Sequence, residues 1–111
     1  MIVHITSRHL DKEVELFFEH YRDDTTAITA ISLQGEPEFV ATVSIPNEKP
    51  REGCVFLKGW SENEGIPEAL AKAGVVRLTG RKVKAGFCEA IEAEVLVTPV
   101  WRRMTHKQFQ Q

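Results

Sequence analysis

The sequence is poor in the residues on which disulfide frameworks and metal sites depend. Its 111 residues include two cysteines, Cys54 and Cys88, which form no CxxC motif and have no neighbouring pair of histidines. This pattern supports neither a disulfide framework nor a zinc site, so we expect two reduced thiols in or near the core. The histidines are scattered without metal-ligand spacing, and we therefore expect no metal site.

Long apolar runs are absent as well. No stretch of the sequence is long enough to span a bilayer. Met1 leads directly into Ile2–Ile5, without the basic region and the extended apolar region of a secretory signal. We therefore expect a cytoplasmic protein that does not contact a membrane.

Nucleotide-binding and catalytic motifs are also missing. Thr79–Arg81 lacks the spacing of a phosphate-binding loop, and the chain contains no GxGxxG motif. A nucleophilic Cys88 would need an orienting residue and an oxyanion hole, and no motif for either is present. Asp23–Asp24 is better interpreted as a turn than as an acid–base pair. We therefore predict a protein that is not an enzyme and that uses no cofactor.

What the chain does contain is the composition of one small globular domain. Apolar residues make up 42% and charged residues 27% of the sequence, as in globular proteins generally. The length leaves no room for a second core. The net charge of −2 gives no global attraction to nucleic acid, but residues 99–111 carry basic side chains and no acid. We therefore divide the chain into a single α+β domain over 1–98 and a basic C-terminal tail over 99–111.

The N-terminal part of the sequence favours strands. Met1–Ile5 is rich in β-branched residues, and Val14, Leu16 and Phe18 then alternate with more polar residues, as in a half-buried strand. A helix is the alternative for the second segment, because several apolar residues there also share one helical face. These residues are Leu10, Val14, Phe17, Phe18 and Tyr21. We favour the strand.

A β-hairpin is predicted next. Thr25–Leu33 and Phe39–Ile45 have strand character, and Gln34–Glu38 between them has the Gly and Pro chemistry of a hairpin loop. Two prolines make Pro46–Gly53 an exposed connection, because proline donates no ladder hydrogen bond. Cys54–Lys58 is a short apolar strand.

One short helix follows. Ser61–Glu64 has the form of a capping box, in which the serine hydroxyl and Glu64 satisfy free amides at the helix start. Pro67 would then fall inside the helix and remove a hydrogen bond. We therefore expect an irregular or 3₁₀ opening turn over Ser61–Gly65 and an α-helix to Ala73, with Gly74 as the left-handed C′ residue.

The remaining strands complete the predicted fold. Val75–Leu78 and Ile91–Val97 alternate as strands, and Thr79–Phe87 between them is a basic, glycine-bounded loop or a loose hairpin arm. The order of elements predicts an α+β protein. We expect a curved antiparallel sheet of about five to six strands, with one short helix packed on one face.

One constellation of residues suggests a partner-binding surface. Cations interleaved with aromatic residues suit phosphate contact or a protein interface, and the alternative is a solvated hairpin edge with gatekeeping lysines. The start of the C-terminal tail has the same character, and its tryptophan is either a packing anchor or an exposed contact residue. The candidate partner-binding residues are Trp60, Arg77, Arg81, Lys82, Lys84, Phe87, Trp101, Arg102 and Arg103.

A family resemblance adds context to this constellation. Its signature consists of Ser61–Gly65, Ala69-Leu70, Ala73-Gly74, Thr79–Arg81 and Gly86-Phe87. In these residues, and over about residues 13–97, the chain resembles a group of small uncharacterised proteins encoded by phages, plasmids and other mobile bacterial elements. Such accessory proteins often bind a host or competitor protein, including components of bacterial defence systems. The resemblance implies no catalytic residues.

Three functional hypotheses follow. The first is a non-enzymatic protein-binding accessory protein of a mobile element, with an anti-CRISPR-like inhibitor of a bacterial defence system as its specific case. The second is a nucleic-acid-binding module that uses the basic 77–84 segment and the C-terminal tail. The third is a small enzyme or ligand binder with a pocket between helix and sheet. A homodimer formed through an exposed strand edge is compatible with all three.

Overall fold

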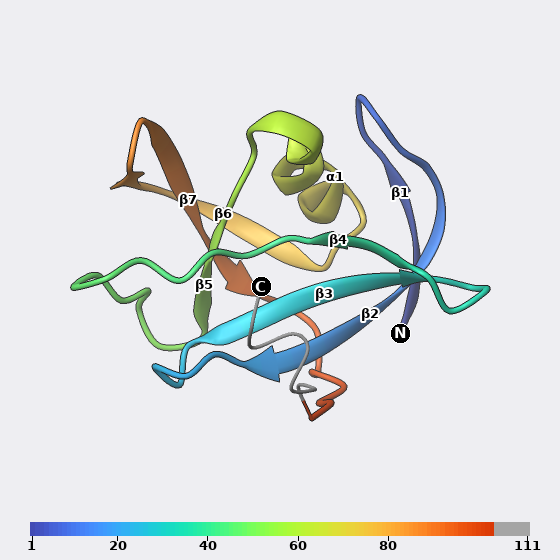
Figure 1. The fold of residues 1–111 in the computed structure, drawn as a ribbon, viewed down its shortest axis with the longest axis horizontal. Coiled ribbons are helices and arrows are strands. Elements are labelled where there is room, and N and C mark those ends of the chain that lie inside the picture. Colours follow the sequence, from blue (N-terminus) through green and yellow to red (C-terminus); the bar gives the residue numbers. More distant parts are fainter. Residues whose placement is uncertain (104–111) are drawn as a thin grey trace.

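Two antiparallel sheets and one short helix make up the fold (Figure 1). The computed structural model describes residues 1–103. The four-stranded sheet has the order β1-β2-β3-β4, and the three-stranded sheet has the order β5-β7-β6. The elements are β1 (Ile2–Thr6), β2 (Asp11–His20), β3 (Thr26–Ser32), β4 (Pro37–Val40), β5 (Cys54–Leu57), the 3₁₀ turn η1 (Ser61–Asn63), α1 (Ile66–Lys72), β6 (Val76–Ala85) and β7 (Cys88–Val95).

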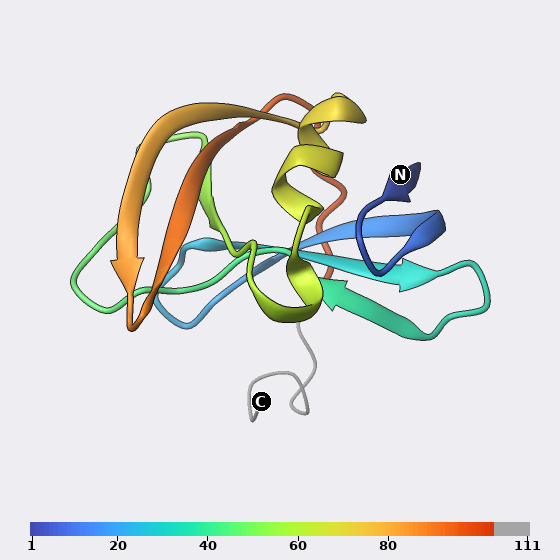
Figure 2. The same cartoon turned by 90° about the horizontal axis from the view of Figure 1, so that it is seen from above.

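The predicted α+β class is confirmed, but the predicted single sheet of about five to six strands is not. Seven strands fall into two sheets because the chain leaves the first sheet after β4. In Figure 2 the second sheet and α1 lie on the same side of the first sheet. No helix among residues 1–103 is long and apolar enough to cross a membrane.

The segment that alternates between apolar and polar residues is a strand, as predicted, and not a helix. In β2, Val14, Leu16 and Phe18 point into the core and are at most 1% exposed. The strand pairs with β1 on one side and with β3 on the other. The alternation of apolar and polar residues with a period of two therefore correctly identifies the side chains that face the core.

The prediction of one continuous strand over residues 39–45 is wrong in part. The strand β4 ends at Val40, and the register of β3 and β4 shifts between Ala30 and Ile31. The next residue, Ala41, donates its N–H to Ile28 of β3 at 2.8 Å and accepts the N–H of Lys58 at 2.9 Å. The chain therefore crosses from the first sheet to the second at Ala41.

The core lies between the two sheets and is closed by α1. Ile66 and Leu70 stand four residues apart on one face of the helix and are at most 1% exposed. They belong to the same buried cluster as Phe18 and Ile28 of the first sheet and Val55 of the second. The interface between helix and sheets is thus filled by apolar side chains.

The start of the helix confirms one prediction and corrects another. A 3₁₀ turn precedes α1, as expected from Pro67, but neither helix has a side-chain capping bond. Glu64 instead accepts a hydrogen bond from Arg8 at 2.9 Å. The N-cap of α1 is Gly65, which has φ = 86°. The predicted left-handed conformation after the helix is confirmed at Gly74, with φ = 79°.

The basic segment over residues 79–87 is mainly a strand and not a loop. The strand β6 continues to Ala85, with an irregularity in its pairing to β7 between Leu78 and Lys82. This irregularity takes up the extra residues of β6 and lets the pairing resume. The alternative prediction, a hairpin arm, therefore describes the segment correctly.

The described part of the predicted tail lies against β2. Trp101 pairs in parallel with Phe18. Phe18 donates its N–H to Val100 at 2.9 Å, and Arg102 donates its N–H to Phe18 at 2.7 Å. We call residues 100–102 the C-terminal strap. The rest of the predicted tail, from residue 104 onward, lies outside the described residues.

Candidate functional site

The nine candidate partner-binding residues do not form one surface. Five of them, Arg77, Arg81, Lys82, Lys84 and Phe87, lie on the hairpin of β6 and β7. Two of the remaining residues lie in the C-terminal strap, and Arg103 follows it. Trp60 is half-buried and directly precedes η1. The candidate residues chosen from the sequence therefore fall on two separate parts of the fold. One is the hairpin of the second sheet, and the other is the strap that lies against the first sheet.

The hairpin presents an aromatic side chain at its tip. Gly86 and Phe87 form the turn that joins the paired residues Ala85 and Cys88. Gly86 has φ = 65°, a conformation that favours glycine. The side chain of Phe87 is 110% exposed, and Figure 1 shows the turn at the periphery of the molecule. A fully exposed phenylalanine on a tight turn is a candidate contact residue.

Two lysines stand behind this tip. Lys82 and Lys84 are exposed and alternate with Val83, which packs against the small cluster of Ile45, Phe56 and Ala90. Neither lysine has an ion-pair partner within residues 1–103. The apolar tip and the two free cations together form what we call the hairpin surface: Lys82, Lys84 and Phe87.

The two arginines of the hairpin are engaged within the fold. Arg77 pairs with Glu94, which stands opposite it on β7. Arg81 contacts Glu92 at 2.8 Å and Glu48 at 3.4 Å. These arginines therefore stabilise the hairpin and are not free to bind a partner without losing those contacts.

A buried carboxylate anchors the base of the hairpin. Glu92 is fully buried and accepts hydrogen bonds from Arg51 at 2.9 Å, Thr79 at 2.8 Å and Arg81 at 2.8 Å. Burial alone would raise the pKa of Glu92, but these hydrogen bonds outweigh it and lower the pKa from 4.5 to about 2. The network ties the hairpin to the connection before β5. Sequence analysis missed it because Glu92 looks like an ordinary polar-face residue of its strand.

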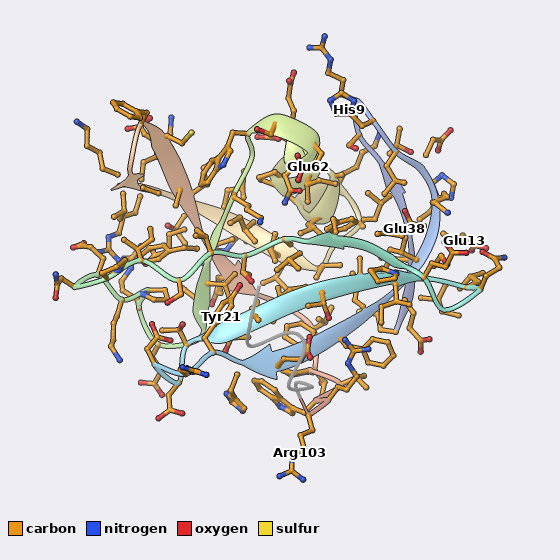
Figure 3. All side chains as sticks on the ribbon, in the orientation of Figure 1. His9, Glu13, Tyr21, Glu38, Glu62 and Arg103 are labelled. Carbon is orange, nitrogen blue, oxygen red and sulfur yellow. The ribbon has the colours of Figure 1, made fainter. Side chains whose placement is uncertain are left out.

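The C-terminal strap holds its aromatic and basic residues against β2. Trp101 stacks on His20 with ring centroids 4.3 Å apart and remains 49% exposed, so it is both a packing anchor and an exposed residue. The guanidinium of Arg102 lies 4.6 Å from the ring centre of Phe17 and contacts Glu19 at 3.3 Å. In Figure 3 Arg103 extends away from the molecule.

The other potentially reactive side chains considered are those of histidine and cysteine. Within residues 1–103 they either pair with a nearby side chain or lack the partners that catalysis or metal binding would need. The ring of His4 lies 2.7 Å from the carboxylate of Asp11. Cys54 and Cys88 are free thiols, as predicted, and burial raises the pKa of Cys54. Residues 1–103 contain no group of three side chains that could hold a metal ion.

The outer edge of β4 is poorly suited to pairing with another strand. The strand begins with Pro37, and its pairing with β3 is irregular. Asn63 donates its side-chain amide to the carbonyl of Val40 at 2.8 Å and thereby occupies one edge group. Proline and irregular pairing are features that hinder edge-to-edge association. A homodimer of the predicted kind would have to use another edge.

Comparison of the chain with family models, with curated proteins and with solved structures finds no match.

Proposed function

We propose that the protein is a non-enzymatic binding protein that contacts another protein through the hairpin surface. The observation that supports the proposal is the 110% exposure of Phe87 at the hairpin tip. Transfer of such a side chain from water into a partner's pocket contributes roughly 1.5–3 kcal/mol. Aromatic side chains that a partner can bury in a pocket are frequent anchors of protein interfaces.

The charges next to Phe87 define the partner's surface. Lys82 and Lys84 are exposed and lack ion partners within residues 1–103. An acidic rim around an apolar pocket would complement them and speed association. Glu92 ties the base of the hairpin to the fold, which limits the backbone entropy that the hairpin loses when it binds. A hairpin anchored in this way suits recognition of a folded protein.

The family resemblance suggests the biological setting. Small accessory proteins of phages and plasmids often act by binding a host or competitor protein. We therefore propose a component of a bacterial defence system as the partner, with an anti-CRISPR-like inhibitor as the specific case. This part of the proposal rests on the resemblance of the signature residues, including Ser61–Gly65 and Gly86-Phe87, to those of the mobile-element proteins. It does not rest on the geometry of the hairpin.

Nucleic-acid binding receives less support from the same residues. Of the candidate cations, Arg77, Arg81 and Arg102 are paired with Glu94, Glu92 and Glu19. A nucleic-acid site needs several free cations that follow the phosphate backbone. An enzyme with a pocket between helix and sheet is also less supported, because Ile66 and Leu70 fill that interface.

Site-specific photo-crosslinking tests the hairpin surface. A photoreactive phenylalanine analogue at position 87 should form a covalent adduct of one defined mass in a bacterial lysate. The matched control places the analogue at Leu33, an apolar residue of a different loop that is 50% exposed. Charge reversal with Lys82→Glu and Lys84→Glu should abolish the adduct at position 87. Equal labelling from both positions, or labelling that survives charge reversal, would refute the proposal.

A further inference from the structure

We propose that a groove on the outer face of β3 and β4 binds a small anionic molecule with an apolar body. The groove encloses about 510 Å³, a size typical of small-molecule sites. It lies on the first sheet, whereas the hairpin surface belongs to the second. This inference is therefore independent of the function proposed above.

The shape of the groove follows from the path of the backbone. Its floor includes Ala27, Thr29 and Ile31 of β3, which alternate along the strand with the core residues Ile28 and Ala30. The register shift beside Ile31 and the departure of the chain at Ala41 bend the neighbouring strand away from a flat sheet. A concave outer face results, next to the C-terminal strap.

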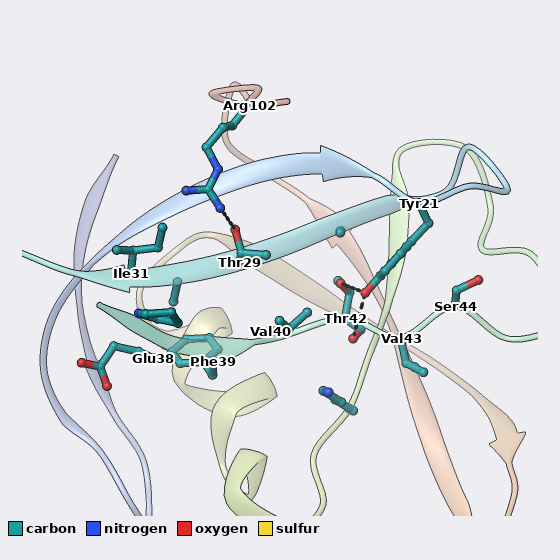
Figure 4. A pocket seen from close by; sticks show the side chains of 14 residues that line it. Tyr21, Thr29, Ile31, Glu38, Phe39, Val40, Thr42, Val43, Ser44 and Arg102 are labelled. Atoms are coloured by element: carbon teal, nitrogen blue, oxygen red, sulfur yellow. Dashed lines mark hydrogen bonds between the residues drawn. The ribbon is translucent and has the colours of Figure 1, made fainter. Parts of the chain in front are cut away.

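Two polar side chains border the groove in fixed positions (Figure 4). Tyr21 contacts the hydroxyl of Thr42 at 2.9 Å and its carbonyl at 3.2 Å. Burial raises the pKa of Tyr21, so its hydroxyl stays protonated and keeps its hydrogen bond to the carbonyl of Thr42. Arg102 donates to Thr29 at 3.4 Å and approaches β3 from the strap. Both side chains are thus positioned before any ligand arrives.

The charges that line the groove are unbalanced in favour of an anion. The carboxylate of Glu38 is already paired with Lys12 at 2.7 Å. Lys58 also lines the groove, is half-buried and has no ion-pair partner within residues 1–103. The Nε atom of Arg102 is buried without a hydrogen-bond acceptor. The guanidinium of Arg102 is already paired with Glu19 at 3.3 Å, which leaves Lys58 as the unpaired cation of this lining. A half-buried cation beside apolar surface favours a ligand with an anionic oxygen.

The apolar part of the lining defines the rest of the ligand. Ile31, Phe39, Val40 and Val43 contribute hydrocarbon surface to the groove. An aromatic or branched aliphatic carboxylate or sulfonate would bury its body on these side chains and direct its charge to Lys58. A strongly polar ligand such as a sugar would leave this apolar surface uncovered.

Titration calorimetry with naphthoate, an aromatic carboxylate, tests the inference on the full chain. Neutral naphthylmethanol is the matched probe without charge. We expect saturable naphthoate binding, weaker binding of the neutral probe, and a loss of about five- to tenfold in naphthoate affinity for Lys58→Gln. Lys72→Gln, which removes an exposed lysine of α1 outside the groove, should leave the affinity unchanged.

Amide chemical shifts locate the binding site in the same samples. Naphthoate should shift the resonances of residues 29–31 and 38–44, and Val40→Trp should abolish binding by filling the groove while the remaining spectrum stays folded. Equal affinity for both probes, an unchanged affinity of Lys58→Gln, or shifts confined to other regions would overturn the inference. None of these outcomes would affect crosslinking from position 87, so the two proposals fail separately.

Discussion

The guanidinium of Arg102 lies 3.3 Å from the carboxylate of Glu19 and thereby fastens the C-terminal strap to β2. The side chain of Glu19 is fully buried, whereas that of Arg102 is 29% exposed. One oxygen of Glu19 and the Nε atom of Arg102 have no hydrogen-bond partner. The pair therefore offsets the cost of burying Glu19 only in part.

Removal of the arginine should destabilise the fold. Arg102→Met leaves the buried Glu19 carboxylate without its cation, and we expect a loss of about 1–3 kcal/mol in the free energy of unfolding. Glu19→Gln combined with Arg102→Met should recover part of this loss, because no buried charge remains. Urea denaturation measures the free energy of unfolding of the single and the double variant, with Arg103→Met as the exposed control. A double variant no more stable than Arg102→Met would contradict this account.

Acid should destabilise the protein through Glu92. Hydrogen bonds hold its folded-state pKa at about 2, below the usual 4.5, so the unfolded state binds a proton more readily as the pH falls. The stabilising contribution is therefore complete above pH 4.5 and is lost as the pH falls toward 2. The free energy of unfolding of the wild type should fall more steeply in this window than that of Glu92→Gln. Parallel pH profiles of the two proteins would exclude a role for Glu92.

The sequence predicts elements well where hydrophobic alternation and side-chain burial coincide. Val14, Leu16 and Phe18 identify β2, and Pro67 indicates the irregular start of the helix. Alternation continues through Ala41 and does not reveal that the chain changes sheets there. The pattern reports which face is buried but not which strand lies alongside. The division into two sheets was therefore not predictable from periodicity.

The candidate residues were recognisable by type, but their contacts were not. Lys82, Lys84 and Phe87 stand out in a basic segment with an aromatic residue. The pairing of Arg77 with Glu94 depends on the register of β6 and β7, and the irregular register in this hairpin has no clear signal in the sequence. The groove beside β4 was missed entirely, because its lining comes from segments that are distant in the chain.

The glycine after α1 should be required for its backbone conformation alone. Gly74 has φ = 79°, and a β-carbon there would meet no atom within 4 Å. Gly74→Ala should therefore cost about 1–2 kcal/mol of stability from the left-handed conformation. Gly74→Asn should cost less, because asparagine adopts this conformation more readily. Thermal unfolding distinguishes the two variants, and equal losses would point to a steric cause instead.

Phe87→Ala should separate binding from stability. Because Phe87 is fully exposed, its truncation should change the free energy of unfolding by no more than about 0.5 kcal/mol. Phe18→Ala is the matched control, since Phe18 is 1% exposed and its truncation should cost about 3–5 kcal/mol. A partner identified by crosslinking from position 87 should bind Phe87→Ala at least about tenfold more weakly, since anchor residues cost more than 1 kcal/mol when truncated. Calorimetry with that partner measures the loss. Full affinity of a folded Phe87→Ala protein would show that the hairpin tip is not the contact surface.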